Sequence, residues 1–209
     1  MRGLSDAPDL EATGLEGVLA HAVQHHHPSL VVLCSFQKEE SVLLDALLAL
    51  APDARVVTID TGVLFDETLA TWRAFEQRFG VHVEVQDATA AGEPWSAQRC
   101  CAEAKVAALE RALAGADAWI TGIRREQGAA RAGALKVEWD ERRAMWKYNP
   151  LADWTQADLW ARIHERDLPY HPLHDDGYES IGCAPCTAPG AGREGRWAGS
   201  AKTECGLHV

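Results

Sequence analysis

Hydrophobic and polar positions along the chain form two alternating kinds of segment. Short apolar runs rich in β-branched residues are typical of buried parallel strands. They occur at residues 30–36, 55–60, 81–85 and 118–121, with a further candidate at 135–139. Longer segments of mixed polarity predict helices, at residues 42–50, 65–79, 101–113 and 155–164. This alternation indicates βαβ units and an α/β fold with a mostly parallel sheet.

Polar loops follow three of the predicted strands, at residues 35–38, 60–62 and 121–124. In parallel sheets, ligands bind outside the carboxyl ends of the strands. The loops therefore predict a nucleotide-sized site at one edge of the sheet. Their hydroxyl, amide, basic and glycine residues are the candidate substrate contacts: Ser35, Gln37, Lys38, Thr61, Gly62, Gly122 and Arg124.

The first of these loops allows two interpretations. Residues 35–41 can form an anion cradle, in which amides at the start of a helix face a phosphate, or an ordinary loop with a serine cap. The Gly-x-x-x-x-Gly-Lys pattern of a P-loop is missing. The loop alone therefore does not decide between them.

Chain length, net charge and hydropathy limit the domain organisation and the classes of partner that we expect. The 209 residues suit one domain with a tail, and we expect an α/β nucleotide-binding domain at residues 1–187 and a flexible tail at residues 188–209. A formal net charge of −11 argues against a nucleic-acid partner. No apolar stretch approaches the roughly 18 residues that cross a bilayer, and no secretory signal is visible, so we expect a cytoplasmic protein without a membrane partner. The sequence leaves oligomeric state open, a homo-oligomer included.

An anionic small substrate would need local basic patches against this net charge. Basic residues gather in three places: Arg99 with Lys105, Arg124 with Arg125, and Arg193 with Arg196 and Lys202. Of these, Lys105, Arg193 and Arg196 join the candidate substrate contacts. Lys105 stands four residues after Cys101, on the same face of a predicted helix, where a solvated lysine is the alternative.

Four of the six cysteines form two pairs, Cys100 with Cys101 and Cys183 with Cys186. Four thiolates suit tetrahedral zinc or an iron–sulfur cluster. Adjacent cysteines on one helix point about 100° apart, so they hardly bind one zinc together but can reach two irons of a cubane. We therefore favour a 4Fe–4S cluster, with zinc, a Cys100–Cys101 disulfide or unrelated core thiols as alternatives.

The remaining two cysteines differ from these pairs and from each other. Cys34 lies in an apolar strand and is expected to be a buried, inert thiol. Cys205 stands in the polar tail beside Gly206, close to Lys202 and His208, and nearby cations favour the reactive thiolate. Glu204 opposes that effect. Cys205 and His208 are the candidate catalytic residues, and a stray terminal thiol is the alternative.

Nine motifs in order along the chain carry a resemblance to a known family. They occupy residues 35–41, 60–68, 100–106, 121–127, 149–155, 168–175, 180–187, 193–197 and 204–208. They include Cys-Cys-Ala-Glu-Ala-Lys-Val, Ser-Ile-Gly-Cys-Ala-Pro-Cys-Thr and Glu-Cys-Gly-Leu-His, and the combination of all nine in this order is specific. On these motifs the chain resembles the assimilatory sulfonucleotide reductases, and among them the thioredoxin-dependent adenylyl-sulfate (APS) reductases.

The resemblance implies a fold, a reaction and a cofactor. The fold is a Rossmann-like open sheet with helices on both faces, as in adenine nucleotide α-hydrolases and ATP pyrophosphatases. The reaction is reduction of APS to sulfite and AMP, with Cys205 as nucleophile, an S-sulfocysteine intermediate, and thioredoxin or a glutaredoxin-like protein as reductant. The cofactor is a 4Fe–4S cluster on the four paired cysteines.

Rival functions are kept at this stage. Phosphoadenylyl-sulfate (PAPS) reductases share the Glu-Cys-Gly-Leu-His tail but generally lack both cysteine pairs, so the pairs favour APS. A non-catalytic nucleotide-binding module with structural zinc belongs to another class, in which Cys205 is incidental. An ATP-dependent thiolation enzyme is disfavoured, because residues 35–41 depart from the phosphate loop of ATP pyrophosphatases.

Overall fold

The computed structural model describes residues 7–89, 103–197 and 204. Its helices and strands are α1 (Leu15–His26), β1 (Leu30–Leu33), α2 (Lys38–Leu50), β2 (Arg55–Asp60), α3 (Asp66–Phe79), β3 (Val83–Asp87), α5 (Lys105–Ala112), β4 (Ala118–Ile120), β5 (Val137–Asp140), β6 (Met145–Tyr148) and α6 (Gln156–Glu165). Short 3-10 helices are η3 (Arg125–Gln127), η4 (Ala129–Arg131), η5 (Pro172–His174) and η6 (Ala184–Cys186).

The six described strands form one sheet in the order β3-β2-β1-β4-β6-β5. All neighbours pair in parallel except β5 and β6, which are antiparallel at one edge. The predicted α/β fold with a mostly parallel sheet is therefore confirmed. The candidate strand at 135–139 is this antiparallel edge strand, shifted to Val137–Asp140. Its partner β6 was not predicted, because only Trp146 and Tyr148 of its four residues are buried.

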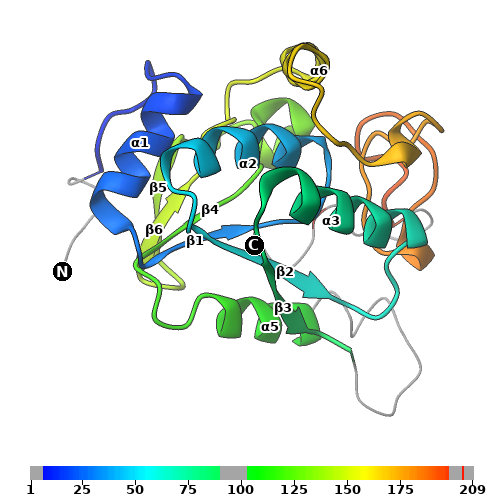
Figure 1. Cartoon of the computed structure of the whole chain (residues 1–209), viewed down its shortest axis with the longest axis horizontal. Coiled ribbons are helices and arrows are strands. Elements are labelled where there is room, and N and C mark those ends of the chain that lie inside the picture. The colour runs from blue at the N-terminus through cyan, green and yellow to red at the C-terminus, as the bar shows by residue number, and fades with distance from the viewer. Residues whose placement is uncertain (1–6, 90–102, 198–203, 205–209) are drawn as a thin grey trace.

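The central strand β1 separates two apolar cores. Leu30 and Val32 face one core, and Val31 faces the other, as the period of two along a strand requires. Figure 1 shows α1, α2 and α3 on one face of the sheet and α5 on the opposite face. The prediction of helices on both faces is thus confirmed, and a strand buried on both sides explains the unbroken apolar run.

Helix α2 begins four residues earlier than the apolar pattern predicts. Its first turn is polar, yet Lys38, Glu39, Glu40 and Ser41 are all buried. The backbone N–H of Gln37 donates to the Glu40 carboxylate at 3.0 Å, which satisfies a donor that a helix start leaves open. Burial of charged residues at a helix start signals a site at this end of the sheet.

The C-terminal stretch turns back onto the fold. Ala188 N–H donates to the Gly195 carbonyl at 2.9 Å, and Trp197 N–H donates to the Cys186 carbonyl at 2.8 Å. Trp197 is only 5% exposed and packs in the same core as α5. Residues 188–197 are therefore packed against the sheet domain. The predicted boundary at 187/188 stays a prediction.

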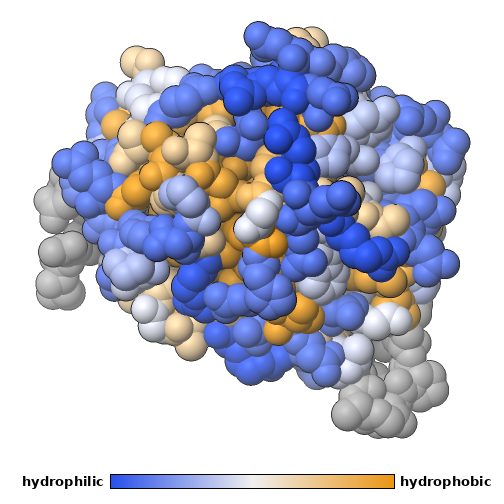
Figure 2. All heavy atoms as spheres, in the orientation of Figure 1, coloured by the Kyte–Doolittle hydropathy of each residue, from blue (hydrophilic) through white to orange (hydrophobic). Residues whose placement is uncertain are grey.

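Polar side chains cover most of the rim in the view of Figure 2, and apolar ones gather toward its left and centre. Within the described ranges, the large apolar residues that are nearly half exposed are Leu50, Val85 and Leu135. Across the same ranges, the helices are all too short or too polar to cross a bilayer.

The two leucines at the end of α2 offer a matched test of the core. Leu47 is fully buried, whereas Leu50 is 44% exposed. Leu47→Ala should lower the free energy of unfolding by about 2–5 kcal/mol, because it leaves a cavity, and Leu50→Ala by less than about 0.5 kcal/mol. Urea unfolding of both variants measures this. Equal losses would contradict the packing of α2 against the sheet.

Candidate active site

A cavity of about 410 Å³ opens where β1 and β4 end. Its walls come from the start of α2, the segment after β4, and two C-terminal segments at residues 179–182 and 192–196. This volume suits a ligand of nucleotide size. Seven of the predicted contacts line it: Ser35, Gln37, Lys105, Gly122, Arg124, Arg193 and Arg196. Lys38, Thr61 and Gly62 are not among the lining residues.

The turn between β1 and α2 depends on Phe36. This residue has φ = 60°, a left-handed conformation that is unusual for a large side chain. Its buried ring stacks on Trp72 at 5.4 Å and meets Phe75 edge-on at 5.7 Å between ring centroids. These contacts hold a backbone conformation that would otherwise favour glycine. The sharp turn leaves Ser35 and Gln37 beside the cavity.

Glu40 lies at the bottom of this turn and is only 5% exposed. Its carboxylate accepts hydrogen bonds from the Ser35 hydroxyl and the Gln37 backbone N–H, both at 3.0 Å. Burial, together with the charge of Glu39, raises the pKa of Glu40 to about 8, against the smaller effect of these two hydrogen bonds. Glu40 is therefore mostly protonated near neutral pH.

Glu39 and Arg124 form a buried ion pair on the adjacent wall. The Arg124 Nε donates to Glu39 Oε1 at 3.0 Å, and both side chains are about 5% exposed or less. Arg124 Nη1 also donates to Glu126 at 2.7 Å and to the Trp154 carbonyl at 3.1 Å. Burial alone would raise the pKa of Glu39, but the charges of Lys38 and Arg124 outweigh it and lower the pKa. Arg124 thus lines the cavity as the counter-charge of Glu39.

Gly122 is required by the close approach of β4 to α2. A Cβ atom there would lie 2.6 Å from Glu40 Oε1 and 2.8 Å from Glu39 Cβ. No side chain fits in that space without moving the buried carboxylates. The predicted contact residue therefore also serves packing.

The start of α2 is tied to the C-terminal wall of the cavity. Lys38 is 2% exposed, and its ammonium donates to the Glu179 carbonyl at 2.6 Å. The side-chain oxygen of Gln37 accepts from the Ile181 N–H at 2.8 Å. Lys38 therefore holds the wall segment at residues 179–182 in place from the side away from the cavity, which explains why it does not line the cavity.

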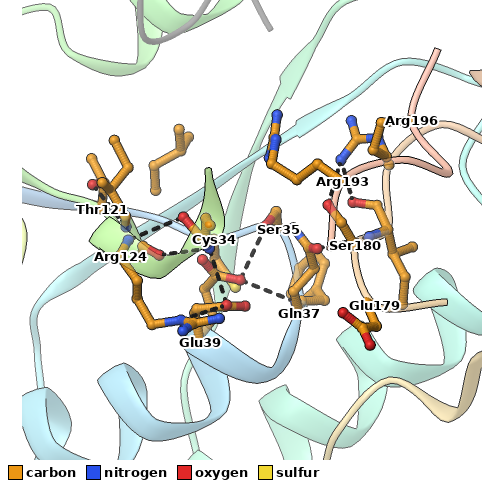
Figure 3. A pocket seen from close by; sticks show the side chains of 18 of the residues that line it. Cys34, Ser35, Gln37, Glu39, Thr121, Arg124, Glu179, Ser180, Arg193 and Arg196 are labelled. Carbon is orange, nitrogen blue, oxygen red and sulfur yellow. Dashed lines mark hydrogen bonds and ion pairs between the residues drawn. The ribbon is translucent and has the colours of Figure 1, made fainter. Parts of the chain in front are cut away.

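Two arginines approach the cavity from the C-terminal stretch, as Figure 3 shows. The guanidinium carbons of Arg193 and Arg196 lie 5.3 and 4.6 Å from the ring centroid of Trp197. Arg196 Nη1 donates to the Ser180 hydroxyl at 3.2 Å and to the Ile181 carbonyl at 3.0 Å. Stacking on one buried ring preorganises both cations for an anion.

The Cys183–Cys186 loop lies next to these arginines. Both thiols are buried, and the Thr61 hydroxyl is 3.2 Å from Cys183 Sγ. Ala184 N–H donates to the Val63 carbonyl at 2.9 Å. Thr61 and Val63 therefore contact the cysteine loop, and Leu64 of the same segment lines the cavity. The contact with Cys183 explains why Thr61 does not line the cavity.

This cysteine loop fits half of a four-thiolate centre. Cys186 ends η6 and Cys183 is the residue just before it, and Cys186 packs in the same core as Ala104, just before α5. Cys100, Cys101, Cys205 and His208 lie outside the described residues. Within the ranges the structure describes, no group of three or more His, Cys, Asp or Glu side chains is placed to hold a metal ion.

Several residues of the site were not predicted: Glu39, Glu40, Gln127, Arg131 and Trp197. Gln127 donates to Glu39 at 3.0 Å and accepts from Arg131 at 2.5 Å, and Arg131 lines the cavity. A pair of glutamates in the first turn after a buried strand is a sequence signal for such a site. Trp197 closes the motif at residues 193–197, but the sequence does not show that its ring stacks on both arginines.

Comparison with known proteins gives a family. Residues 29–189 match the phosphoadenosine phosphosulfate reductase domain, more than half of the chain. The chain belongs to this family.

Relatives within the family carry two different names. A protein of Gloeobacter violaceus named phosphoadenosine 5'-phosphosulfate reductase is 46% identical over 93% of this chain and 88% of its own length. A protein of Bacillus pumilus named adenosine 5'-phosphosulfate reductase is 42% identical over 93% of this chain and 91% of its own length. Family membership is therefore shown, and the names differ on the nucleotide.

Solved structures agree with the fold. The crystal structure of PAPS reductase from Candida auris, a phosphate complex, has a TM-score of 0.72 at 25% identity and covers 86% of this chain and 94% of that one. FMN adenylyltransferase of Candida glabrata, at 17% identity, shares the fold alone, with a TM-score of 0.67 over 85% of this chain and 62% of that one. The predicted adenine-nucleotide fold is confirmed.

Glu40 gives a pH test of the site. Its folded pKa of about 8 lies above the ordinary 4.5, so the protonated form stabilises the fold, and that stability is lost as pH rises between these values. Glu40→Gln keeps an oxygen acceptor and has no charge. Its unfolding free energy relative to the wild type should therefore rise by about 1 kcal/mol or more from about pH 5 to about pH 8.

The control for this test is Glu141→Gln, which changes an exposed glutamate. Urea unfolding across this pH range should show no such trend for the control. Parallel pH curves for the wild type and Glu40→Gln would show that Glu40 is ionised in the folded protein.

Proposed function

We propose that this chain reduces adenosine 5'-phosphosulfate (APS) to sulfite and AMP in sulfate assimilation, with Cys205 as nucleophile. One observation carries the proposal. The carboxylate of Glu204 accepts from Arg193, a residue of the cavity wall, at 2.7 Å. Cys205 follows Glu204 directly, and consecutive Cα atoms are about 3.8 Å apart, which supports Cys205 as the nucleophile for a substrate in this cavity.

The proposed chemistry is a balanced transfer of a sulfuryl group. The Cys205 thiolate attacks the sulfur of APS, the bond from sulfur to the phosphate oxygen breaks, and AMP leaves. An external dithiol then attacks the Cys205 sulfur, which releases sulfite and forms a mixed disulfide. Its second thiol resolves this disulfide and restores Cys205. The dithiol becomes a disulfide and supplies the two electrons.

The residues of the cavity have distinct proposed tasks. Arg193, Arg196 and Lys105 neutralise the phosphosulfate, whose negative charge opposes attack by a thiolate. Ser35, Gln37 and Gly122 contact the nucleoside, and His208 assists Cys205. Arg124 lines the cavity as the counter-charge of Glu39, and Lys38 holds the opposite wall. Thr61 contacts Cys183, and Gly62 turns the chain after it with φ = 69°.

We propose a 4Fe–4S cluster on Cys100, Cys101, Cys183 and Cys186. The burial of Cys183 and Cys186 on one turn supports it, as does the shared core with Ala104. Cys101 is three residues from Ala104, at most about 11 Å along the chain. When bound, the cluster supplies a structural link and an electrostatic field, because the thiol chemistry is complete without it.

APS is the proposed substrate because the chain keeps both cysteine pairs and because relatives such as that of Bacillus pumilus are named for it. PAPS is the second candidate, supported by the name of the Gloeobacter violaceus relative. Initial rates with both nucleotides decide between them. A PAPS reductase would need further basic contacts for the 3'-phosphate.

The proposed reductant is thioredoxin or a glutaredoxin-like protein. The four proposed ligands leave Cys34 as the remaining thiol beside Cys205. Cys34 lies at the cavity but is 2% exposed, and burial raises the pKa of its thiol well above the usual value, which disfavours the reactive thiolate. Reduced thiols are required throughout, which favours the cytoplasm. The proposed tail at residues 188–209 begins with the packed segment 188–197. We propose that the part of the tail after Trp197 carries Cys205 between the cavity and the reductant.

Cys205→Ser tests the nucleophile. Sulfite formation from APS with thioredoxin should fall to background, because serine is a far weaker nucleophile at neutral pH. Binding of APS should persist within about threefold, since the cavity is unchanged. Mass spectrometry should find a sulfite adduct on the Cys205 peptide of the wild type only. Near-normal turnover by the variant would refute the scheme.

Cys183→Ser tests the cluster, with Cys34→Ser as the matched control because both thiols are 2% exposed. Anaerobic iron and sulfide analysis should show most of both lost from Cys183→Ser and retained in Cys34→Ser. Zinc without iron in the wild type would favour the rival, a non-catalytic nucleotide-binding module.

A further inference from the structure

The tail returns to the cavity through a three-residue ion cluster, here called the Glu204 latch: Arg131, Arg193 and Glu204. Arg131 binds the carboxylate with two bonds, from Nε at 2.8 Å and from Nη2 at 2.9 Å. Arg193 Nη2 adds a third bond at 2.7 Å. Bidentate arginine–carboxylate pairs combine strength with a defined direction.

The latch is largely shielded from water. The side chains of Glu204 and Arg131 are each 10% exposed, and that of Arg193 is 17% exposed. Breaking one partner of such a pair leaves the other charge poorly solvated, so the contact is not a weak surface pair. Two arginines against one carboxylate also leave a net positive charge at the cavity wall.

Both arginines of the latch are held in place by residues other than Glu204. Arg131 Nη1 donates to Gln127 Oε1 at 2.5 Å, and Gln127 Nε2 donates to the buried Glu39 at 3.0 Å. Arg193 stacks on the buried Trp197. The latch is therefore a preorganised receptor for one carboxylate, built from segments more than 60 residues apart in sequence.

We propose that Glu204 is a positioning residue of the reductase. Its carboxylate docks the tail on Arg131 and Arg193, and this fixes Cys205, the next residue, for attack on the substrate. The inference rests on the proposed function of Cys205 but adds a role for its neighbour. Glu204 itself takes no part in bond making or breaking.

A purely electrostatic role predicts the opposite sign. Glu204 is one residue from Cys205, so its negative charge disfavours the thiolate, and its removal would speed the reaction. A positioning role predicts that removal slows the reaction, because the thiol is no longer held at the cavity. The sign of the effect therefore separates the two roles.

The experiment compares Glu204→Gln with Glu194→Gln in the full-length reduced protein. Glu194 is an exposed glutamate of the same C-terminal stretch outside the latch, so its variant removes the same charge without the contact. Single-turnover formation of the Cys205 sulfite adduct from APS should slow by about 10- to 100-fold in Glu204→Gln, a loss typical of charged hydrogen bonds. Glu194→Gln should react at the wild-type rate.

Two further measurements fix the interpretation. Equilibrium binding of APS to Glu204→Gln should be unchanged or tighter, and weaker binding would overturn the proposal by making Glu204 part of the nucleotide site. Amide hydrogen exchange of the C-terminal peptide, without nucleotide, should be faster in Glu204→Gln than in Glu194→Gln. Equal exchange would overturn the docked tail.

The exchange measurement also keeps the two proposals distinct. Faster exchange in Glu204→Gln, with no sulfite adduct in the wild type, would leave the latch standing and refute the proposed function. An adduct that forms equally fast in the wild type and in Glu204→Gln would refute the latch and leave the proposed function standing.

Discussion

The buried ion pair between Glu39 and Arg124 is the interaction on which the cavity depends. It joins the start of α2 to the segment after β4, the two elements that form the carboxyl edge of the sheet. Burial of two charges is costly, and it is tolerated only where the bonding is nearly complete. Here the charge of Lys38 also stabilises the Glu39 carboxylate, and Gln127 donates a hydrogen bond to it. Gln127 in turn accepts a hydrogen bond from Arg131, which links Arg131 to the ion pair.

The neighbouring Glu40 shows how the same helix start satisfies a second carboxyl group. Ionising both Glu39 and Glu40 would be unfavourable, because the two buried carboxylates would repel each other with little solvent to screen them. Glu39 takes the counter-charge, and Glu40 takes the proton and two hydrogen-bond donors. The left-handed turn at Phe36 leads directly into this arrangement.

Trp197 connects the loop of Cys183 and Cys186 with the two arginines at the cavity, Arg193 and Arg196. Its backbone bonds to Cys186, and its ring supports Arg193 and Arg196. The cysteine loop and the substrate arginines are therefore one packed unit. The same fold serves a flavin adenylyltransferase at 17% identity, so the chemistry belongs to these side chains and not to the sheet.

By itself, the sequence determined the α/β fold, the parallel strands, the edge at which the cavity lies and the family. These follow from local patterns: apolar runs, the helices between them, and motifs that stay intact along the chain. Strand β6, which is parallel to β4, was not predicted, because only two of its four residues are buried and so short a pattern carries too little signal. Only the tertiary structure decided which charged residues face the cavity and which face each other. In the sequence, nothing separates charged residues such as Lys38, Arg124, Arg131 and Glu204 from charged residues on the surface. Their roles depend on partners that are often far away along the chain, and no local pattern records such partners.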